Sequence, residues 1–344
     1  MADVPLTLSG LVLEQKYRGR MVQQINRRST LLRVLKCIPA MGQNCAWGVK
    51  GAGQNGEQYS EGADAVNFGS NAQLQALETW GYYRSNFHVT GTARRGAQYA
   101  VTPEGQSNTV LANIEDSTRQ LTTTINQALW NDPGTAGYVG GMGVAVGSTT
   151  NVYAGIDRTV GANSFWLPYT VNPGSLTPLT FAQIRADQNA ILIASGEFPD
   201  LGFCDPYTYT TIGSLFDPNR RYTVDTFSTA RGEITLQGGM KAIEFDGTFF
   251  IKDKDSPANT ITYLSSQFVH IEYLPPPPDL MAQLAELGMG VEADDGYGAI
   301  PLGYFLEKLS KTGDSDKFML TWNGQLVVER PNACGQRTNI QMAS

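Results

Sequence analysis

Charged residues are scarce in this sequence: Asp, Glu, Lys and Arg make up 17% of its 344 residues, below the ~25% usual for globular proteins. Gly (37) and Pro (17) are plentiful, which favours strands, turns and extended connections over long solvated helices. Much of the surface is therefore predicted to be uncharged. Proteins whose faces are covered by neighbours have this property, because interface cores are depleted of charge. Gly-rich secreted β-proteins share the same composition.

Long apolar runs and export signals are also missing. No run approaches the ~18 apolar residues that a membrane span needs, and the first residues, Met1-Ala-Asp-Val-Pro5, lack the basic region of a signal peptide. A chain this long needs no disulfide staples. We therefore expect no membrane role, and we expect reduced thiols at the four scattered cysteines, Cys37, Cys45, Cys204 and Cys334.

The sequence offers few candidates for a metal or cofactor site. His88 and His270 are the only histidines, and their apolar, strand-like surroundings favour core or interface positions over metal binding. Gly51–Gly56 matches the glycine pattern of dinucleotide sites, but a polar segment without apolar periodicity follows, so a flexible loop is expected. Asp253 and Asp255 resemble a cation pair but lack the Gly and the distal Glu of a calcium loop, and a hairpin turn explains them better.

Catalytic motifs are missing as well. The chain has no Gly-x-Ser-x-Gly elbow and no Gly-x-x-x-x-Gly-Lys-Ser/Thr phosphate loop. Asp294 and Asp295 precede Gly296 in a predicted loop, which leaves a carboxylate enzyme as a remote alternative. The sequence therefore predicts a protein without catalysis and without a cofactor.

What charge there is gathers at the N-terminus. Seven basic residues against Asp3 and Glu14 give residues 1–36 a net charge of +5, which leaves −12 for the rest. Apolar residues recur there close to helical spacing: Leu13, Tyr17, Met21, Ile25, Leu32 and Leu35. The pattern predicts a basic amphipathic arm that reaches nucleic acid or a neighbour's acidic surface. A solvated helix face is the alternative. Because later segments can form a core, we expect residues 1–36 to be dispensable for folding.

A long hairpin is predicted next. Cys45–Lys50 is typical of a short strand, and Glu78–Thr90 is strongly β-prone. Between them, residues 51–73 contain five glycines and many Asn, Gln and Ser. A loop this long without structure of its own is unusual in a compact domain. We expect something outside the subunit to hold it.

Helices and further strands follow. Ser107 is a candidate cap for a helix ending at Trp130, with an apolar stripe of Val110, Leu111, Ile114, Leu121, Ile125 and Leu129. A capping-box pattern at Thr180–Gln183 opens a second helix that closes at Gly196, and a short helix is expected over 207–216. After Gly232 an antiparallel meander is predicted, with strands at 233–237, 241–245, 247–251 and 259–264. Pro275–Pro278 marks an extended link, and strand-like segments follow at 317–322 and 325–330. No internal repeat is present.

The order of these parts resembles the major capsid protein family of tailed phages, which has the Hong Kong 97-type shell fold. The resemblance covers most of the chain and implies an α+β architecture. Phe198–Pro206 resembles the strand-to-helix step of the family's axial domain, and Phe245–Asp253 resembles the strand, turn and Asp pattern of its peripheral domain. Trp322–Cys334 is similar to its C-terminal strands.

The resemblance also implies a division of the chain. Trp47 and Tyr83 would lie in the strands that flank the extension loop. The implied parts are an N-terminal arm (1–44), an extension-loop hairpin (45–90), a peripheral segment with the spine helix (91–131), an axial domain (132–223) and a peripheral β-region with the C-terminal strands (224–344).

The implied function is that of a head protein whose pentamers and hexamers form an icosahedral shell around a double-stranded DNA phage genome, assembled in the bacterial cytoplasm. Arm and extension loop would lie on neighbouring subunits. The expected intersubunit contacts are Arg18, Arg20, Arg27 and Arg28 in the arm and Glu57, Glu61 and Asp64 in the loop.

Two departures from the family pattern matter. No lysine lies between Gly51 and Gln73, so the Lys–Asn cross-linking of some members is not expected. The chain begins directly with the arm, so either a separate scaffolding protein or unaided assembly is expected, and portal and decoration proteins are further possible partners. The alternatives are an encapsulin-type shell with protein cargo, a phage tail, decoration or adhesion protein, and a secreted β-rich hydrolase.

Overall fold

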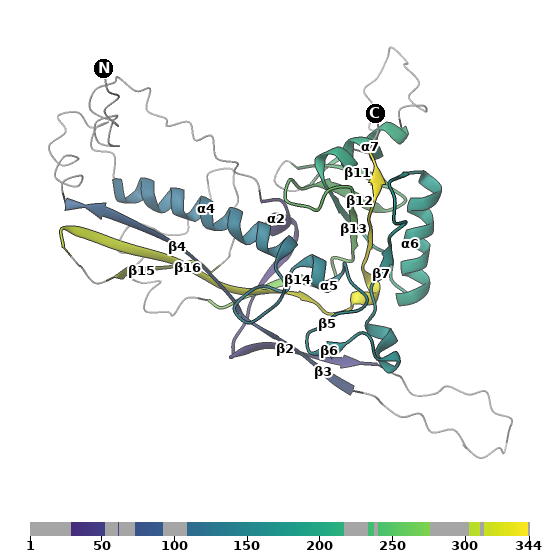
Figure 1. The fold of residues 1–344 in the computed structure, drawn as a ribbon, viewed down its shortest axis with the longest axis horizontal. Coiled ribbons are helices and arrows are strands. Elements are labelled where there is room, and N and C mark those ends of the chain that lie inside the picture. Colours follow the sequence, from purple (N-terminus) through teal and green to yellow (C-terminus); the bar gives the residue numbers. More distant parts are fainter. Residues whose placement is uncertain are drawn as a thin grey trace, which may run out of the picture.

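The computed structural model describes residues 29–51, 61, 73–91, 109–216, 233–236, 240–275, 303–309 and 313–342. Figure 1 shows a long helix lying along one sheet, beside a second sheet that is covered by shorter helices. No helix in these ranges is both long and apolar enough to cross a membrane.

The helices are short except for two. They are α2 (Leu31–Val34), α4 (Thr109–Asn131), α5 (Met142–Ala145), α6 (Phe181–Ser195) and α7 (Pro206–Phe216), with the 3-10 helices η1 (Gly161–Trp166) and η3 (Pro331–Ala333).

The strands form two larger sheets and three two-stranded pairs. They are β1 (Lys36–Pro39), β2 (Asn44–Lys50), β3 (Gln73–Thr79), β4 (Gly81–Thr90), β5 (Val152–Tyr153), β6 (Ile156–Asp157), β7 (Tyr169–Val171), β8 (Thr177–Pro178), β9 (Leu201–Cys204), β10 (Glu233–Leu236), β11 (Met240–Phe245), β12 (Thr248–Lys252), β13 (Ile261–Leu264), β14 (Val269–Tyr273), β15 (Phe305–Leu309), β16 (Ser315–Val328), β17 (Gly335–Arg337) and β18 (Ile340–Gln341).

The first sheet is built around β16, a single 14-residue strand where the sequence suggested two shorter segments. β4 pairs antiparallel with its first part, and β15 and β14 pair with its other side. Side chains alternate along β4, so that Val89 is buried while Arg84 and His88 are exposed. Helix α4 lies along the sheet (Figure 1).

Helix α4 confirms the predicted long helix. Leu121, Ile125 and Leu129 are almost fully buried, as expected for one face of an amphipathic helix. Pro133 and Gly134, whose φ is +69°, follow its last turn. The proposed cap Ser107 and the side chains of Val110, Leu111 and Ile114 lie outside the described residues.

The second sheet has the order β10-β11-β12-β9-β13-β17-β7. The antiparallel β10-β11-β12 part of the predicted meander is confirmed, and Asp246 and Gly247 form its turn with φ values of 47° and 87°. The predicted step from β12 to β13 is wrong, because β9 lies between them and runs parallel to β12. Strand β9 is buried along its whole length. Its backbone N–H and C=O groups cannot reach water, so they need hydrogen-bond partners on a neighbouring strand at each edge.

The two helices on this sheet start as the sequence predicts. Thr180 and Gln183 form a reciprocal capping box at α6, and Gly196, with φ +77°, ends that helix. The Asp205 carboxylate accepts hydrogen bonds from the backbone N–H groups of Tyr207 and Thr208 at the start of α7. The predicted strand-to-helix step over Phe198–Pro206 is therefore present as β9 followed by α7.

A buried ion pair joins α6 to this sheet. The Arg337 guanidinium donates to both Asp187 carboxylate oxygens at 2.5 and 2.6 Å, and the hydroxyl groups of Tyr169 and Tyr263 donate to the same carboxylate. The sheet combines strands from both sides of residue 223, the predicted boundary between the axial and peripheral domains.

All four cysteines are free thiols. Cys45, Cys204 and Cys334 are buried, and burial raises the pKa of the Cys334 thiol to about 12. Burial also raises the pKa of Cys37 to about 11. At neutral pH these groups are protonated and act as small apolar side chains.

Candidate assembly elements

The hairpin of β2 and β3 is the base of the predicted extension loop. The two strands pair antiparallel from Asn44 and Thr79 to Lys50 and Gln73, which confirms a hairpin around residues 51–72. Figure 1 shows it along the lower edge of the molecule.

The returning strand is shorter than predicted. It ends at Thr79, and β4 then pairs with β16, so Tyr83 lies opposite Trp322 and not in the hairpin. Two residues explain the break. Trp80 is buried and its indole N–H donates to the Gly42 carbonyl at 3.1 Å. A Cβ at Gly81 would lie 2.9 Å from the backbone N of Val139, so only glycine fits this crossing.

Three aromatic rings hold the hairpin against the subunit. We call Trp47, Tyr153 and Trp166 the hairpin clamp. The ring centroid of Trp47 lies 6.4 Å from that of Tyr153 and 6.5 Å from that of Trp166, and Tyr153 and Trp166 stack at 5.9 Å. The backbone N–H of Leu77 also donates to the Ala154 carbonyl at 3.0 Å. The hairpin is thus fixed at its base by aromatic rings and a backbone hydrogen bond.

A buried arginine organises the loop that carries the clamp. Arg158 is 3% exposed, and its guanidinium lies over the Tyr153 ring at 5.1 Å. It donates to five uncharged acceptors at 2.6–3.1 Å: the carbonyls of Val144, Ala145, Ser148 and Trp166 and the side-chain oxygen of Asn151. Burial lowers the pKa of Arg158 to about 10, so it remains charged at neutral pH and all five bonds are charge-assisted.

Glu78 links the hairpin to two other elements. Its carboxylate accepts a hydrogen bond from the Ala154 N–H at 2.8 Å and one from the Gln325 side-chain amide at 3.3 Å. The Gln325 carbonyl oxygen accepts from the Gly140 N–H at 2.9 Å. Glu78 is 8% exposed, and its burial raises the pKa of the carboxyl group. Keeping the Glu78 carboxylate ionised therefore lowers the stability of the folded subunit.

A pH dependence follows from this raised pKa. A carboxyl group whose pKa is raised by folding stabilises the protein below its unfolded pKa, and that contribution is lost as pH rises through the folded pKa. Replacing Glu78→Gln removes the titration. We expect the melting temperature of wild type, relative to E78Q, to fall as pH rises from about 4.3, the usual Glu value. Thermal melts of both proteins between pH 4 and 8 measure this difference, and a constant difference across that range would contradict it.

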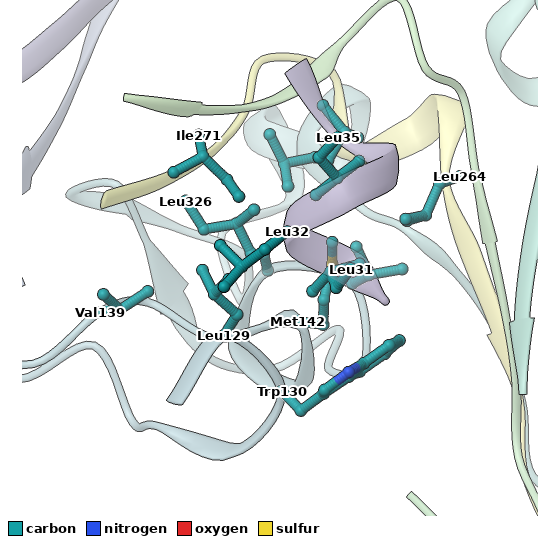
Figure 2. Close-up of a cluster of buried hydrophobic side chains, with 14 of the residues drawn as sticks. Leu31, Leu32, Leu35, Leu129, Trp130, Val139, Met142, Leu264, Ile271 and Leu326 are labelled. Atoms are coloured by element: carbon teal, nitrogen blue, oxygen red, sulfur yellow. The ribbon is translucent and has the colours of Figure 1, made fainter. Parts of the chain in front are cut away.

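The chain that precedes the hairpin packs inside the subunit. Leu31, Leu32 and Leu35 are at most 5% exposed. Figure 2 shows α2 among side chains from α4, α5, β14 and β16, including Trp130 and Leu326. β1 then pairs parallel with β14. The expectation that residues 1–36 are dispensable for folding is therefore wrong for Leu31–Leu35, because these leucines form part of the central core.

Asp253 holds the start of α2 in place. Its Oδ2 accepts hydrogen bonds from the Leu31 backbone N–H at 3.2 Å and from the Trp130 indole N–H at 3.1 Å, and its Oδ1 accepts from the Asp255 N–H at 3.0 Å. Asn126 donates to Asp255 at 2.6 Å. Desolvation raises the pKa of Asp253, so its donors only partly offset the cost of burial.

This geometry corrects the expectation of a hairpin turn at Asp253 and Asp255. The turn connects β12 and β13, which are not adjacent strands. The described residues contain no cluster of three or more His, Cys, Asp or Glu side chains arranged to hold a metal ion. Asp253 binds protein N–H groups instead.

Most of the predicted contact residues lie outside the described ranges. These are Arg18, Arg20, Arg27, Arg28, Glu57 and Asp64. Glu61 is described and is exposed. Their contacts with neighbouring subunits stay a prediction.

Sequence reasoning missed Arg158 and Glu78, and it assigned Asp253 to a hairpin turn. A signal was present for Arg158, because Asp157 and Arg158 are the only charged residues in 133–184. A charge in a long uncharged stretch is a candidate for a buried, hydrogen-bonded group; Arg158 is buried in this way, whereas Asp157 beside it is not.

Comparison with solved structures gives the fold. A chain of the cyanophage A-1(L) capsid is 17% identical with a TM-score of 0.73, covering 95% of this chain and 97% of that one. The capsid of a native GTA particle is 13% identical, with a TM-score of 0.61 and coverage of 97% and 98%. The SrpI encapsulin of Synechococcus elongatus PCC 7942 is 13% identical, with a TM-score of 0.56 and coverage of 97% and 96%. These likenesses confirm the predicted α+β, Hong Kong 97-type shell fold.

Comparison of sequences gives the family. A search of curated proteins gave no match. The family model for SU10 major capsid proteins matches residues 46–341, which include most of the hairpin, all of α4 and both larger sheets except β1. The chain therefore belongs to the SU10 major capsid protein family and is a shell-forming structural protein of the phage capsid.

Proposed function

We propose that this chain assembles as pentamers and hexamers into an icosahedral shell around double-stranded DNA in the host cytoplasm, without catalysis or a cofactor. Separate scaffolding, portal and decoration proteins would complete the particle. The segment carried by β2 and β3 lies on a neighbouring subunit, as do the residues before Ser29. Their proposed contacts include the arm arginines and Glu57, Glu61 and Asp64.

The observation that carries this proposal is that the hairpin of β2 and β3 packs against the subunit on one face only. The clamp rings fix one face of β2 and β3, while Ala46, Gly48 and Leu77 on the other face are exposed. A hairpin that is held against the subunit on one face and exposed on the other can present a polar, Gly-rich segment to a neighbour. Contact area can offset the ~1–2 kcal/mol per residue that ordering such a segment costs.

The charge balance supports an interior that faces DNA. The net charge is −7, and residues 37–344 carry −12. Because Lys and Arg contacts to phosphate dominate nonspecific DNA binding, an acidic body limits adhesion to the packaged genome. Packaged DNA can then move during filling and release.

The test replaces Gly53–Asn71 with Asn-Gly, a turn that can close β2 and β3 beyond their last pair, Lys50 and Gln73. The subunit should stay folded with a nearly unchanged melting temperature, because shortening a flexible loop changes closure entropy by less than a few kcal/mol. Negative-stain imaging should show closed shells for wild type and none for the shortened chain.

A matched control keeps the length and replaces Gly53–Asn71 with a Gly-Ser segment. It should fold but fail to build shells, because it lacks the side chains, including Glu57, Glu61 and Asp64, that are proposed to contact the neighbour. Normal shells from the shortened chain would contradict the proposal, as would a subunit that no longer folds. Nuclease-protected DNA in wild-type particles is the expected content, and protein cargo in its place would favour an encapsulin-type shell.

A further inference from the structure

Two buried carboxylates and a buried amide lie together where α4 meets the connection from β12 to β13. Asp253 and Asp255 come from the connection, and Asn126 comes from α4; we call these three residues the oxygen cluster. Asn126 and Asp253 are 0% and 1% exposed, and the Asp255 side chain is 7% exposed. Carboxylates so far from water need a strong partner.

The Asn126 side chain lies between the two carboxylates. Its Nδ2 donates to Asp255 Oδ2 at 2.6 Å and lies 3.4 Å from each carboxylate oxygen of Asp253. Oxygen ligands bind Ca²⁺ at ~2.3–2.6 Å, so they lie roughly 3–4 Å from one another. The polar atoms of the oxygen cluster already have about this spacing.

Two oxygen atoms here have no hydrogen-bond partner among the residues that the structure describes. They are Oδ1 of Asn126 and Oγ of Ser256, the residue that follows Asp255. A buried polar atom without a partner often marks a bound water or ion. The nitrogen and oxygen of a side-chain amide exchange places by rotation about one bond. The Asn126 oxygen can thus face both carboxylates, where a cation is the partner that it needs.

The charges around the oxygen cluster leave room for a further cation. The Lys254 ammonium lies 3.1 Å from Asp255 Oδ1, which supplies one positive charge for two carboxylates. Asp253 Oδ2 accepts hydrogen bonds from the neutral N–H groups of Leu31 and Trp130. Desolvation raises the pKa of Asp253, and the neighbouring Asp255 charge adds to the rise. A bound cation would offset both effects.

We propose that the oxygen cluster binds one Ca²⁺ ion through the carboxylates of Asp253 and Asp255 and the side-chain oxygen of Asn126. The Ser256 hydroxyl and water complete the coordination. Ca²⁺ fits better than Mg²⁺, because Ca²⁺ accepts irregular sets of protein oxygens whereas Mg²⁺ keeps several waters. A contiguous calcium loop is not needed, since the fold brings Asn126 to Asp253 from 127 positions away.

The ion would have a structural role at a junction of three parts of the subunit. Asp253 contacts Leu31 at the start of α2 and Trp130 on α4, two residues that Figure 2 shows in the same core. Asp255 belongs to the connection between the strands. Binding to the folded state alone stabilises it by mass action. This role concerns the single subunit and does not rest on shell assembly.

The first test uses Tb³⁺, which takes the oxygen ligands of Ca²⁺ and luminesces when a nearby indole is excited. The Trp130 indole nitrogen lies 3.1 Å from Asp253 Oδ2, so excitation of tryptophan in the full chain should give Tb³⁺ emission. Ca²⁺ should displace Tb³⁺ at a concentration roughly ten-fold lower than Mg²⁺. Asp255→Asn should remove most of the emission. The matched control is Asp246→Asn, which changes an exposed carboxylate that pairs with Arg185 at 2.6 Å and should keep the emission. No emission from wild type, or equal emission from D255N, would overturn the proposal.

A second measurement does not require D255N to fold. After treatment with EDTA, the melting temperature of wild type should rise by several degrees when Ca²⁺ is added in excess, and by less with Mg²⁺. Asn126→Ala removes the amide ligand and should abolish most of this rise, whatever its own melting temperature in EDTA. An unchanged melting temperature of wild type, or the same rise in N126A, would show that the oxygen cluster holds no ion. An equal rise with Mg²⁺ would overturn the assignment to Ca²⁺.

Discussion

Deletion of residues 1–36 is expected to yield a chain that does not fold, whereas deletion of residues 1–28 is expected to leave a folded subunit. The difference lies in α2. Leu31, Leu32 and Leu35 are 0%, 2% and 5% exposed, and Figure 2 shows them among side chains of α4, α5, β13, β14 and β16.

Truncating one buried leucine costs about 2–5 kcal/mol, so losing three costs roughly 6 kcal/mol or more, similar to the ~5–15 kcal/mol that stabilises a whole domain. The longer deletion also removes the Leu31 N–H that donates to the Asp253 carboxylate. That carboxylate would remain buried with one donor fewer.

Circular dichroism and urea unfolding of both truncated chains test this expectation. The shorter deletion should show a cooperative transition close to that of the full chain, and the longer one should show none. Leu31→Ala in the full chain is a milder control that should lower stability by about 2–5 kcal/mol. A cooperative transition after removal of residues 1–36 would show that α2 is not part of the core.

The shorter deletion also isolates assembly from folding. It removes Arg18, Arg20, Arg27 and Arg28 and keeps α2, so a folded subunit that builds no shells would support an intersubunit role for the arm. Normal, heat-resistant shells from this chain would contradict that role.

Features set by neighbouring residues were predictable. The capping box at Thr180, the stripe of Leu121, Ile125 and Leu129 and the turn at Asp246 and Gly247 each depend on a few positions in sequence, where periodicity and turn chemistry apply. The ordered combination of such features carried the resemblance to capsid proteins.

Features set by distant residues were not predictable in this way. Leu31 and Asp253 are 222 positions apart, and nothing local marks Leu31 as a core residue and not as part of an arm. The same holds for β9, whose short apolar sequence does not reveal that it enters a sheet between β12 and β13. Strand order depends on long-range pairing, and local patterns leave it open.

Arg158→Met is expected to destabilise the subunit strongly and to loosen the hairpin. Methionine retains much of the volume but donates no hydrogen bond, so five acceptors lose the guanidinium as a donor. Of these, the Val144 carbonyl keeps a second donor, the Asn151 side-chain amide at 2.9 Å. Each buried acceptor left without a partner costs about 1–3 kcal/mol, and the loss should amount to several kcal/mol. Arg185→Met is the matched control, because exposed ion pairs contribute ~0–1 kcal/mol.

The change should be greatest at the hairpin, since Arg158 fixes the loop that carries Tyr153 and Trp166. Amide hydrogen exchange should become faster in β2 and β3 of the Arg158→Met subunit than in wild type, while α6 keeps its protection. Arg158→Lys retains the charge but has only three donors and lacks the planar guanidinium. It should therefore restore only part of the hairpin's protection from exchange. Equal exchange in the hairpin of all three proteins would mean that the clamp holds without the arginine. The Arg158→Met subunit could still fold, show faster exchange in the hairpin and fail to build shells. That result would indicate that the buried guanidinium contributes to assembly by fixing the orientation of the hairpin.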